Sequence, residues 1–118
     1  MAEKFAWDWE YPTVTIKNGR IREVDGKKVY DDYLAGKLKG GFMRYSIESD
    51  YIEMVQLFIS ESDRLKGYGR KLMKFLEKKG KMIRIHTGSV LDDPFGKFLL
   101  KLGYEYIQGE HLNWKKEI

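Results

Sequence analysis

Residues 64–73 read Arg64-Leu65-Lys66-Gly67-Tyr68-Gly69-Arg70-Lys71-Leu72-Met73, so two glycines one residue apart open a basic amphipathic helix. An apolar stretch typical of a buried strand, residues 52–60, comes just before it. Glycine has no Cβ, so its backbone can approach a ligand closely, and the first turn of a helix offers unpaired N–H groups with a partial positive charge. Main chain alone can bind phosphate oxygens in such a loop. The sequence therefore predicts a phosphate-bearing cofactor.

The residues that the loop lacks narrow the choice of cofactor. A nucleoside-triphosphate loop carries Lys and then Ser or Thr after its last glycine, whereas Arg70 and Lys71 follow Gly69 here. A dinucleotide-binding fingerprint needs a third glycine, but Leu72 occupies the matching position. The βαβ unit with an acidic ribose ligand, which should follow such a fingerprint, is also missing from the pattern. Both kinds of site are therefore disfavoured.

The pattern that remains is Arg64, two residues, Gly67, one residue and Gly69 at the start of a helix. It resembles motif A of the GNAT acetyltransferase superfamily, which binds the pyrophosphate of coenzyme A. The preceding strand ends at Ile59, five residues before Arg64, as the superfamily pattern requires. Residues 93–104 resemble motif B, a short helix that ends in a Gly-aromatic pair.

Within that superfamily, the chain is most similar to the histone-type lysine acetyltransferase branch. The similarity covers about residues 50 to 105 and is most specific at Ile59-Ser60, Gly67-Tyr68-Gly69 and Leu72-Met73. It puts Glu53 at the position of the catalytic glutamate. Glu53 lies between apolar residues of the predicted strand, where desolvation would raise its pKa toward the working range of a base.

The resemblance implies direct transfer of the acetyl group of acetyl-CoA to a primary amine, with protein lysine slightly preferred. The backbone N–H of Leu57 would polarise the thioester carbonyl, and the main chain of Leu57 and Ile59 would pair with the pantetheine arm. Strand alternation predicts that Glu53 and Leu57 share a face, about 13 Å apart at roughly 3.3 Å per residue. The amine would then sit between them, with Glu53 acting through water. The residues implied to bind the cofactor are Leu57, Ile59, Arg64, Leu65, Lys66, Gly67, Tyr68, Gly69, Arg70 and Phe98.

The sequence departs from the superfamily pattern at two places: the residue that protonates the leaving thiolate, and the helices that help to bind the acceptor. Many members carry a tyrosine in motif B that protonates the leaving thiolate, and Leu99 occupies that position here. The histone-type branch also lacks it, so activity remains compatible with the sequence. Tyr104 and Tyr106 are interpreted as core or sheet aromatics. No amphipathic helix is predicted in residues 1–40, so the acceptor-side helices are expected to be reduced or absent, and a second subunit of a homodimer could complete that site.

The expected fold class is α+β, with a GNAT-like mixed and mostly antiparallel central sheet, splayed central strands and flanking helices. Asn18-Gly19 and Asp25-Gly26 are read as hairpin turns in an early antiparallel region. Helices are expected from about residue 66 to 79 and from about 93 to 102, with strands at 42–47, 52–60 and 82–86. A closing hairpin is expected from residues 104–107 and 112–114.

Length and composition indicate a single domain over residues 1–118, and the resemblance implies that this domain is GNAT-like. With 42% hydrophobic and 34% charged residues, the chain is ordinary for a soluble globular protein, and cytoplasmic localisation is expected because no membrane span or leader is recognised. The absence of cysteine excludes disulfides and a cysteine acyl-enzyme. His86 and His111 lack paired spacing, so no metal site is predicted; surface or core hydrogen bonding is the preferred interpretation of both, and His86 could titrate near an acceptor.

Two further functions compete with the acetyltransferase. An inactive acyl-CoA-binding regulator would explain the missing tyrosine and acceptor helices, and predicts cofactor binding without turnover. A basic nucleic-acid or partner-binding module would use the Trp7, Trp9 and Tyr11 cluster, and the net charge of +4 and pI near 9.2 favour anionic partners. Asp31, Asp32, Glu48 and Asp50 could form an acidic mouth for a cationic amine, although solvated turns are the alternative.

Overall fold

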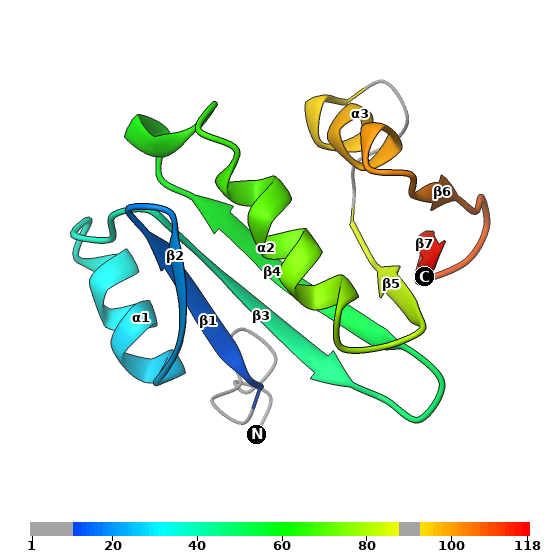
Figure 1. Cartoon of the computed structure of the whole chain (residues 1–118), viewed down its shortest axis with the longest axis horizontal. Coiled ribbons are helices and arrows are strands. Elements are labelled where there is room, and N and C mark those ends of the chain that lie inside the picture. The colour runs from blue at the N-terminus through cyan, green and yellow to red at the C-terminus, as the bar shows by residue number, and fades with distance from the viewer. Residues whose placement is uncertain (1–10, 88–92) are drawn as a thin grey trace.

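A computed structural model describes residues 11–87 and 93–118, which form a seven-stranded sheet in the order β2-β1-β3-β4-β5-β7-β6 (Figure 1). Neighbouring strands are antiparallel except for β4 and β5, which run parallel. The mixed, mostly antiparallel sheet with flanking helices confirms the predicted fold class. The strands are β1 (Thr13–Lys17), β2 (Arg20–Val24), β3 (Gly41–Ile47), β4 (Ile52–Ile59), β5 (Met82–Ile85), β6 (Glu105–Tyr106) and β7 (Trp114–Glu117); the helices are α1 (Gly26–Leu34), α2 (Tyr68–Glu77) and α3 (Pro94–Lys101).

Of the two predicted early turns, one is a hairpin and the other begins a helix. Asn18 and Gly19 have φ angles of 52° and 79° and connect β1 to β2, as a two-residue hairpin turn requires. The predicted hairpin at Asp25-Gly26 is wrong: the Asp25 carboxylate accepts a hydrogen bond of 2.9 Å from the Lys27 N–H and caps α1. Aspartate serves both turns and helix N-caps, so the dipeptide alone was ambiguous.

The prediction that residues 1–40 contain no amphipathic helix is also wrong within the described part. α1 packs Val29 against Phe42 of β3, and Lys27 pairs with Asp31 at 3.1 Å on its exposed side. Because α1 is a single helix of nine residues, the acceptor-side helical segment is reduced rather than absent.

The sheet separates two clusters of buried side chains. Phe42 and Met43 are neighbours on β3 and therefore point to opposite faces. Met43 belongs to the large cluster that includes Leu72 and Leu76 of α2, whereas Phe42 belongs to the small cluster under α1. In Figure 1, α2 lies across the sheet over β4. We call the side covered by α2 the α2 face and the other side the α1 face.

A β-bulge in β4 reverses which of its side chains face α2. Arg44 pairs with Gln56 and Tyr45 pairs with Met54, so Val55 is an extra residue with no opposite partner on β3. Before the bulge, Ile52 and Met54 are buried in the α2-face cluster; after it, that cluster is contacted by Leu57 and Ile59. The even-numbered residues of β4 therefore face α2 before the bulge, and its odd-numbered residues face α2 after the bulge.

The bulge also marks the point where β4 and β5 separate. Their parallel pairing covers only the pairs Ile52–Ile83, Glu53–Arg84 and Met54–Ile85. In the described ranges, no strand pairs with β4 on that side beyond Met54. The predicted splay between central strands is therefore confirmed, and α3 lies on the β5 and β6 side of α2 (Figure 1).

The C-terminal hairpin closes the core beside β5. Trp114 of β7 is completely buried and meets the Tyr106 ring edge-on, with the ring centroids 5.2 Å apart. Tyr104 is buried before β6, and its hydroxyl donates to Glu77 of α2 at 2.9 Å. Lys116 donates to the same carboxylate at 3.3 Å. These contacts join α2 to the C-terminal hairpin. Among the described residues, no helix is both long and apolar enough to cross a lipid bilayer.

Candidate functional site

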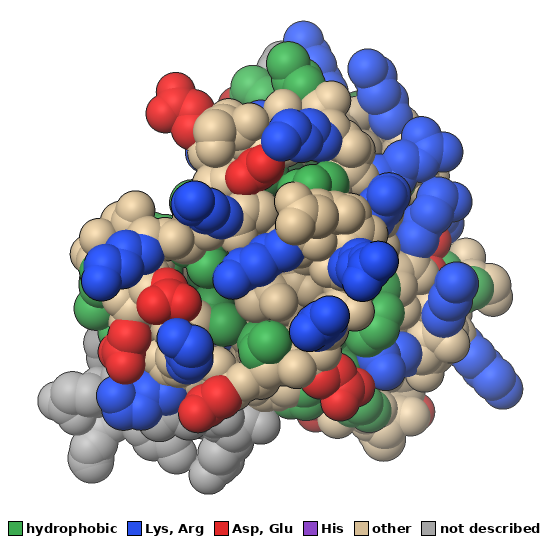
Figure 2. Space-filling view, turned by 60° about the vertical axis from the view of Figure 1, so that its left-hand side comes forward, with side chains coloured by type: hydrophobic (Ala, Val, Ile, Leu, Met, Phe, Trp, Pro, Cys, Tyr) green, Lys and Arg blue, Asp and Glu red, His purple; other side chains and the backbone are tan. Residues whose placement is uncertain are grey.

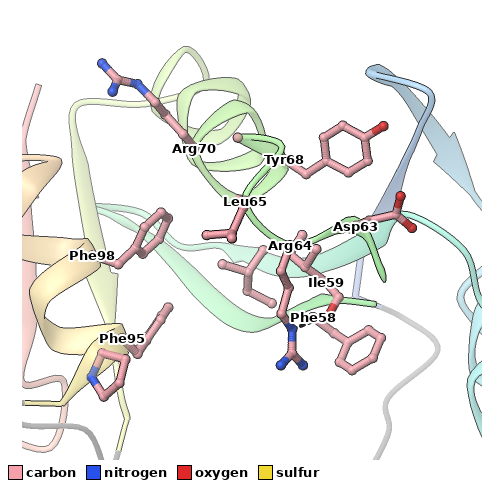
Figure 3. Close-up of a pocket in the computed structure, with 13 residues that line it drawn as sticks. Phe58, Ile59, Asp63, Arg64, Leu65, Tyr68, Arg70, Phe95 and Phe98 are labelled. Carbon is pink, nitrogen blue, oxygen red and sulfur yellow. Dashed lines mark hydrogen bonds between the residues drawn. The ribbon is translucent and has the colours of Figure 1, made fainter. Parts of the chain in front are cut away.

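A groove of about 640 Å³ opens between the end of β4, the start of α2 and the start of α3 (Figure 3). Its walls are mainly apolar, with the two helix starts contributing backbone and basic residues. It is lined by Leu57, Phe58, Ile59, Asp63, Arg64, Leu65, Gly67, Tyr68, Gly69, Arg70, Pro94, Phe95 and Phe98.

Every residue that the sequence implied for cofactor binding lines this groove except Lys66. Lys66 instead donates to the Asp63 carboxylate at 2.7 Å. Figure 3 shows the Arg70 side chain extending away from the other labelled side chains. The structure therefore gathers residues from three separated segments around one cavity.

The glycine loop presents unpaired backbone donors to the groove. Gly67, the residue before α2, has a φ of 80°, in the left-handed region that favours glycine. The first backbone bond of the helix runs from the Lys71 N–H to the Gly67 carbonyl at 3.1 Å. The N–H groups of Tyr68, Gly69 and Arg70 precede that bond and lie at the positive end of the helix. This is the geometry that binds phosphate.

Asp63, which the sequence did not single out, ties this loop to the sheet. Its Oδ2 accepts from the Gly40 N–H at 2.8 Å and from the Ser60 hydroxyl at 2.6 Å, and its Oδ1 accepts from Lys66. The Lys66 ammonium first, and then the Ser60 and Gly40 donors, lower the pKa of Asp63 well below its usual range. The carboxylate therefore stays ionised and holds the loop against the start of β3.

The outer half of β4 offers an unused hydrogen-bonding edge. The Ser60 N–H donates to the Gly40 carbonyl at 2.8 Å, and bonded pairs alternate along an antiparallel ladder. Phe58 and Gln56 therefore bond to β3, whereas Leu57 and Ile59 point their N–H and C=O groups toward the side that β5 has left. Arg64 donates to the Ile59 carbonyl at 3.2 Å. An extended ligand arm could pair with this edge as an added strand does.

Phe95 and Phe98 of α3 form the opposite wall. Their rings stack with centroids 5.8 Å apart, and both side chains are partly buried. A Cβ at Gly69 would lie 3.2 Å from the Phe98 ring, so glycine permits this close approach of α3 to the loop. Phe58, Asp63, Pro94 and Phe95 are lining residues that the sequence did not identify, although the i, i+3 spacing of Phe95 and Phe98 was a signal for a shared helix face.

Glu53 lies outside the groove, and the prediction that it shares a face with Leu57 is wrong. Because Ile52 and Met54 are buried on the α2 face, Glu53 points to the α1 face. The bulge at Val55 then brings Leu57 to the α2 face. The extra residue Val55 interrupts the alternation of side chains between the two faces, so the position of Glu53 does not predict the face of Leu57.

The environment of Glu53 raises the pKa of its carboxyl group. Partial burial is the main cause and the nearby Glu48 carboxylate adds to it, while His111 and then His86 act in the opposite direction. The direction agrees with the expectation for a base in a desolvated position.

This raised pKa predicts a stability change in Glu53→Gln that depends on pH. The ionised carboxylate is less favourable in the folded state than in the unfolded one, so its protonated form contributes stability that is lost as pH rises through the folded pKa. We expect Glu53→Gln to melt at a higher temperature than the wild type at pH 7 and at about the same temperature near pH 3.5, below the usual glutamate pKa of about 4.3. Calorimetric melting at both values measures this, and a less stable variant at pH 7 would contradict it.

Other candidate residues are not brought into the groove. Leu99 is completely buried, and Tyr104 is engaged with Glu77, where burial first and the Glu77 carboxylate second raise the pKa of its hydroxyl. Asp31 lies on α1, while Glu48 lies in the turn between β3 and β4, and Figure 1 shows these at different ends of the sheet. The predicted single acidic mouth is therefore not formed by these residues together.

A second, smaller cavity of about 230 Å³ occupies the splay between β4 and β5. It shares Leu57 and Phe95 with the groove. It is lined by Met54, Val55, Gln56, Leu57, His86, Thr87 and Phe95. The splay therefore connects the region of the groove at Leu57 with the side chains at the end of β5.

No protein-family model matches the chain, and no curated protein sequence does. Among solved structures, the chain is similar to the PaiA N-acetyltransferase from Thermoplasma acidophilum in complex with coenzyme A, with a TM-score of 0.56 and 20% sequence identity. The match covers 70% of this chain and 56% of that one, so the chain spans little more than half the length of its structural neighbour. At this identity the similarity establishes the architecture alone. The sheet order, the splay and the helix that follows β4 together give the chain a GNAT-like fold.

Proposed function

We propose that the protein is an acetyl-CoA-dependent N-acetyltransferase that transfers the acetyl group directly to a primary amine. One observation carries the proposal: a single groove combines the unpaired N–H groups at the start of α2 with the free edge of β4. The first feature suits a pyrophosphate, and the second suits an amide-bearing arm. Coenzyme A contains both, and the solved structural neighbour is a complex with coenzyme A.

In this proposal the pyrophosphate binds at Gly67-Tyr68-Gly69, and the pantetheine arm runs along Leu57 and Ile59. The thioester then reaches the bulge, where the Leu57 N–H stabilises the oxygen that becomes negative during attack. The apolar rings of Phe95 and Phe98 exclude water from the arm. These roles use main chain and aromatic surface, so single side-chain truncations along β4 would report them poorly.

The acceptor amine approaches from the α1 face in the same proposal. Glu53 lies there with a raised pKa, so its carboxyl group can take part in proton transfer on that side of the sheet. Protein lysine is our preferred acceptor because of the similarity to the histone-type branch at Glu53, Ile59-Ser60 and Gly67-Tyr68-Gly69. Polyamines, aminoglycosides and nucleobase amines are the alternatives.

The experiment that tests the proposal is calorimetric titration of the purified chain with acetyl-CoA and with coenzyme A, followed by an assay of thiol release with a panel of amines. We expect saturable binding of both and amine-dependent release of free thiol. Binding without turnover, unchanged by Glu53→Gln, would instead identify an acyl-CoA-binding regulator, the candidate that Leu99 in place of tyrosine favours. Absence of binding would remove the acetyltransferase proposal.

The nucleic-acid alternative gains no comparable support from the described residues. Figure 2 shows Lys and Arg side chains spread across one face of the molecule, with Asp and Glu side chains among them. Trp7 and Trp9 lie outside the described residues, and the Tyr11 ring lies 5.5 Å from the Arg44 guanidinium. Salt-dependent oligonucleotide binding that ignores coenzyme A would revive this alternative.

We place the proposed enzyme in the cytoplasm.

A further inference from the structure

The proposed transfer needs a group that receives the amine proton close to the thioester, and Glu53 is not at that position. The thioester would lie at Leu57, next to the small cavity in the splay. Of the described side chains that line this cavity, His86 is the one whose ring nitrogen can accept a proton from the amine. This inference rests on the proposed function and concerns its acceptor side.

The imidazole of His86 is held in one tautomer. Its Nδ1 lies 2.5 Å from the backbone carbonyl oxygen of His111. A carbonyl only accepts hydrogen bonds, so Nδ1 carries the hydrogen and Nε2 of the neutral ring keeps its lone pair. The two imidazole rings also stack, with centroids 4.1 Å apart and planes 16° from parallel.

The backbone beside His86 is fixed by Asn113. Its side-chain amide accepts from the Thr87 N–H at 3.3 Å and donates to the Thr87 carbonyl at 2.9 Å. The chain immediately after His86 is thus clamped to the segment before β7, although β5 itself ends at Ile85. The segment at residues 111–113 therefore holds both the imidazole, through His111, and the backbone that follows it, through Asn113.

Charged groups of both signs lie on the elements beside the imidazole. Glu53 of β4 and Glu48 of the β3–β4 turn interact with each other, and both stacked histidines act on Glu53 in the direction that favours its charge. Arg84 of β5 is paired with Glu110 at 2.7 Å, and Lys115 of β7 lies opposite Arg84 in the sheet. An imidazolium formed at His86 would be stabilised by Glu53.

We propose that His86 is the catalytic base of the acceptor site and that Glu53 is a positioning residue that acts through it. The amine nitrogen forms a bond to the thioester carbonyl carbon while one N–H proton passes to Nε2 of His86. The C–S bond then breaks, and the sulfur leaves as the thiolate of coenzyme A. The imidazolium returns the proton through solvent to that thiolate, so no separate tyrosine acid is required at the Leu99 position.

Kinetics of His86→Gln test the proton transfer. The probe is acetyl-CoA with hydroxylamine, an amine that is largely neutral at pH 7, and the readout is free thiol. We expect kcat to fall about 100-fold or more while coenzyme A affinity measured by calorimetry stays within about twofold of the wild type. The matched variant His111→Phe keeps the ring stack and the backbone carbonyl, so its loss should be much smaller. A His86→Gln enzyme with the wild-type rate overturns the proposal.

Nuclear magnetic resonance of ¹⁵N-labelled histidine gives a readout that does not need turnover. We expect Nε2 of neutral His86 to lack a hydrogen, and Glu53→Gln to lower kcat while the KM for acetyl-CoA stays unchanged. A protonated Nε2 in the neutral ring, or a kcat unmoved by Glu53→Gln, overturns the assignment. If the wild type binds acetyl-CoA but releases no thiol with any amine, the proposed function fails and the base role of His86 fails with it. The resonance data still test whether Nδ1 of His86 carries the hydrogen.

Discussion

Gly67→Glu is expected to abolish measurable coenzyme A binding, with an affinity loss of at least about 100-fold, or about 2.8 kcal/mol at 1.4 kcal/mol per tenfold. Gly67 stands immediately before the unpaired N–H groups of α2, and no atom lies within 4 Å of the position where a Cβ would be. The added side chain therefore fits sterically, but its carboxylate competes with the pyrophosphate for the same donors and repels it. Calorimetric titration with coenzyme A at moderate salt measures the loss.

Gly36→Glu is the matched control for this substitution. Gly36 follows α1, has a φ of 70° and likewise has open space around its Cβ position. Both variants place an L-residue in the left-handed region, which costs roughly 1–2 kcal/mol of stability. We expect equal loss of stability in the two and loss of cofactor binding only in Gly67→Glu. Wild-type affinity in Gly67→Glu would show that the loop does not hold the pyrophosphate.

Gly40→Ala is expected to be the most destabilising of these glycine substitutions. A Cβ at Gly40 would lie 1.8 Å from the Ile16 carbonyl oxygen, a backbone atom that cannot move without displacing β1. The overpacking and the left-handed φ of 75° together should lower the free energy of unfolding by about 3–5 kcal/mol. Domains of this size have only about 5–15 kcal/mol in total, so a marginally folded variant is expected in urea titrations.

The same substitution should weaken the cofactor site, because the Gly40 N–H donates to Asp63 and thereby anchors the loop before α2. Gly36→Ala separates the cost of the left-handed backbone from the cost of the steric clash. Its added methyl group meets open space, so the substitution should lower the free energy of unfolding by only about 1–2 kcal/mol. Equal stability of Gly40→Ala and Gly36→Ala would mean that β1 and β3 are not as close at this point as the structure has them.

The sequence was informative where a few adjacent residues determine the local structure. The Asn18-Gly19 turn, the start of α2 at the glycine loop and the strand before it depend on backbone preferences that the residues themselves carry. The groove was predictable for the same reason, because a site built from main-chain donors is recorded in glycine spacing. Asp25 failed as a signal because the same side chain caps helices and initiates turns.

Contacts between distant segments were not predictable in this way. Asp63 matters because Gly40 is brought beside it, and His86 gains its orientation from His111 and Asn113. These residues are separated from their partners by more than 20 positions, and no local pattern specifies such an arrangement. The face of Glu53 was misassigned because the register shift at Val55 arises from pairing with β3, which strand periodicity alone does not contain.

The extra residue at Val55 shifts the side-chain alternation of β4 by one position. Each side chain after Val55 therefore lies on the opposite face of the sheet from the one that alternation in the first half of the strand would predict. Deleting this one residue would restore simple alternation, yet it would turn Leu57 and Ile59 toward α1 and carry Phe58 into the core beneath α2. A one-residue deletion here should therefore be far more damaging than most substitutions, and related sequences should be aligned separately on either side of Val55.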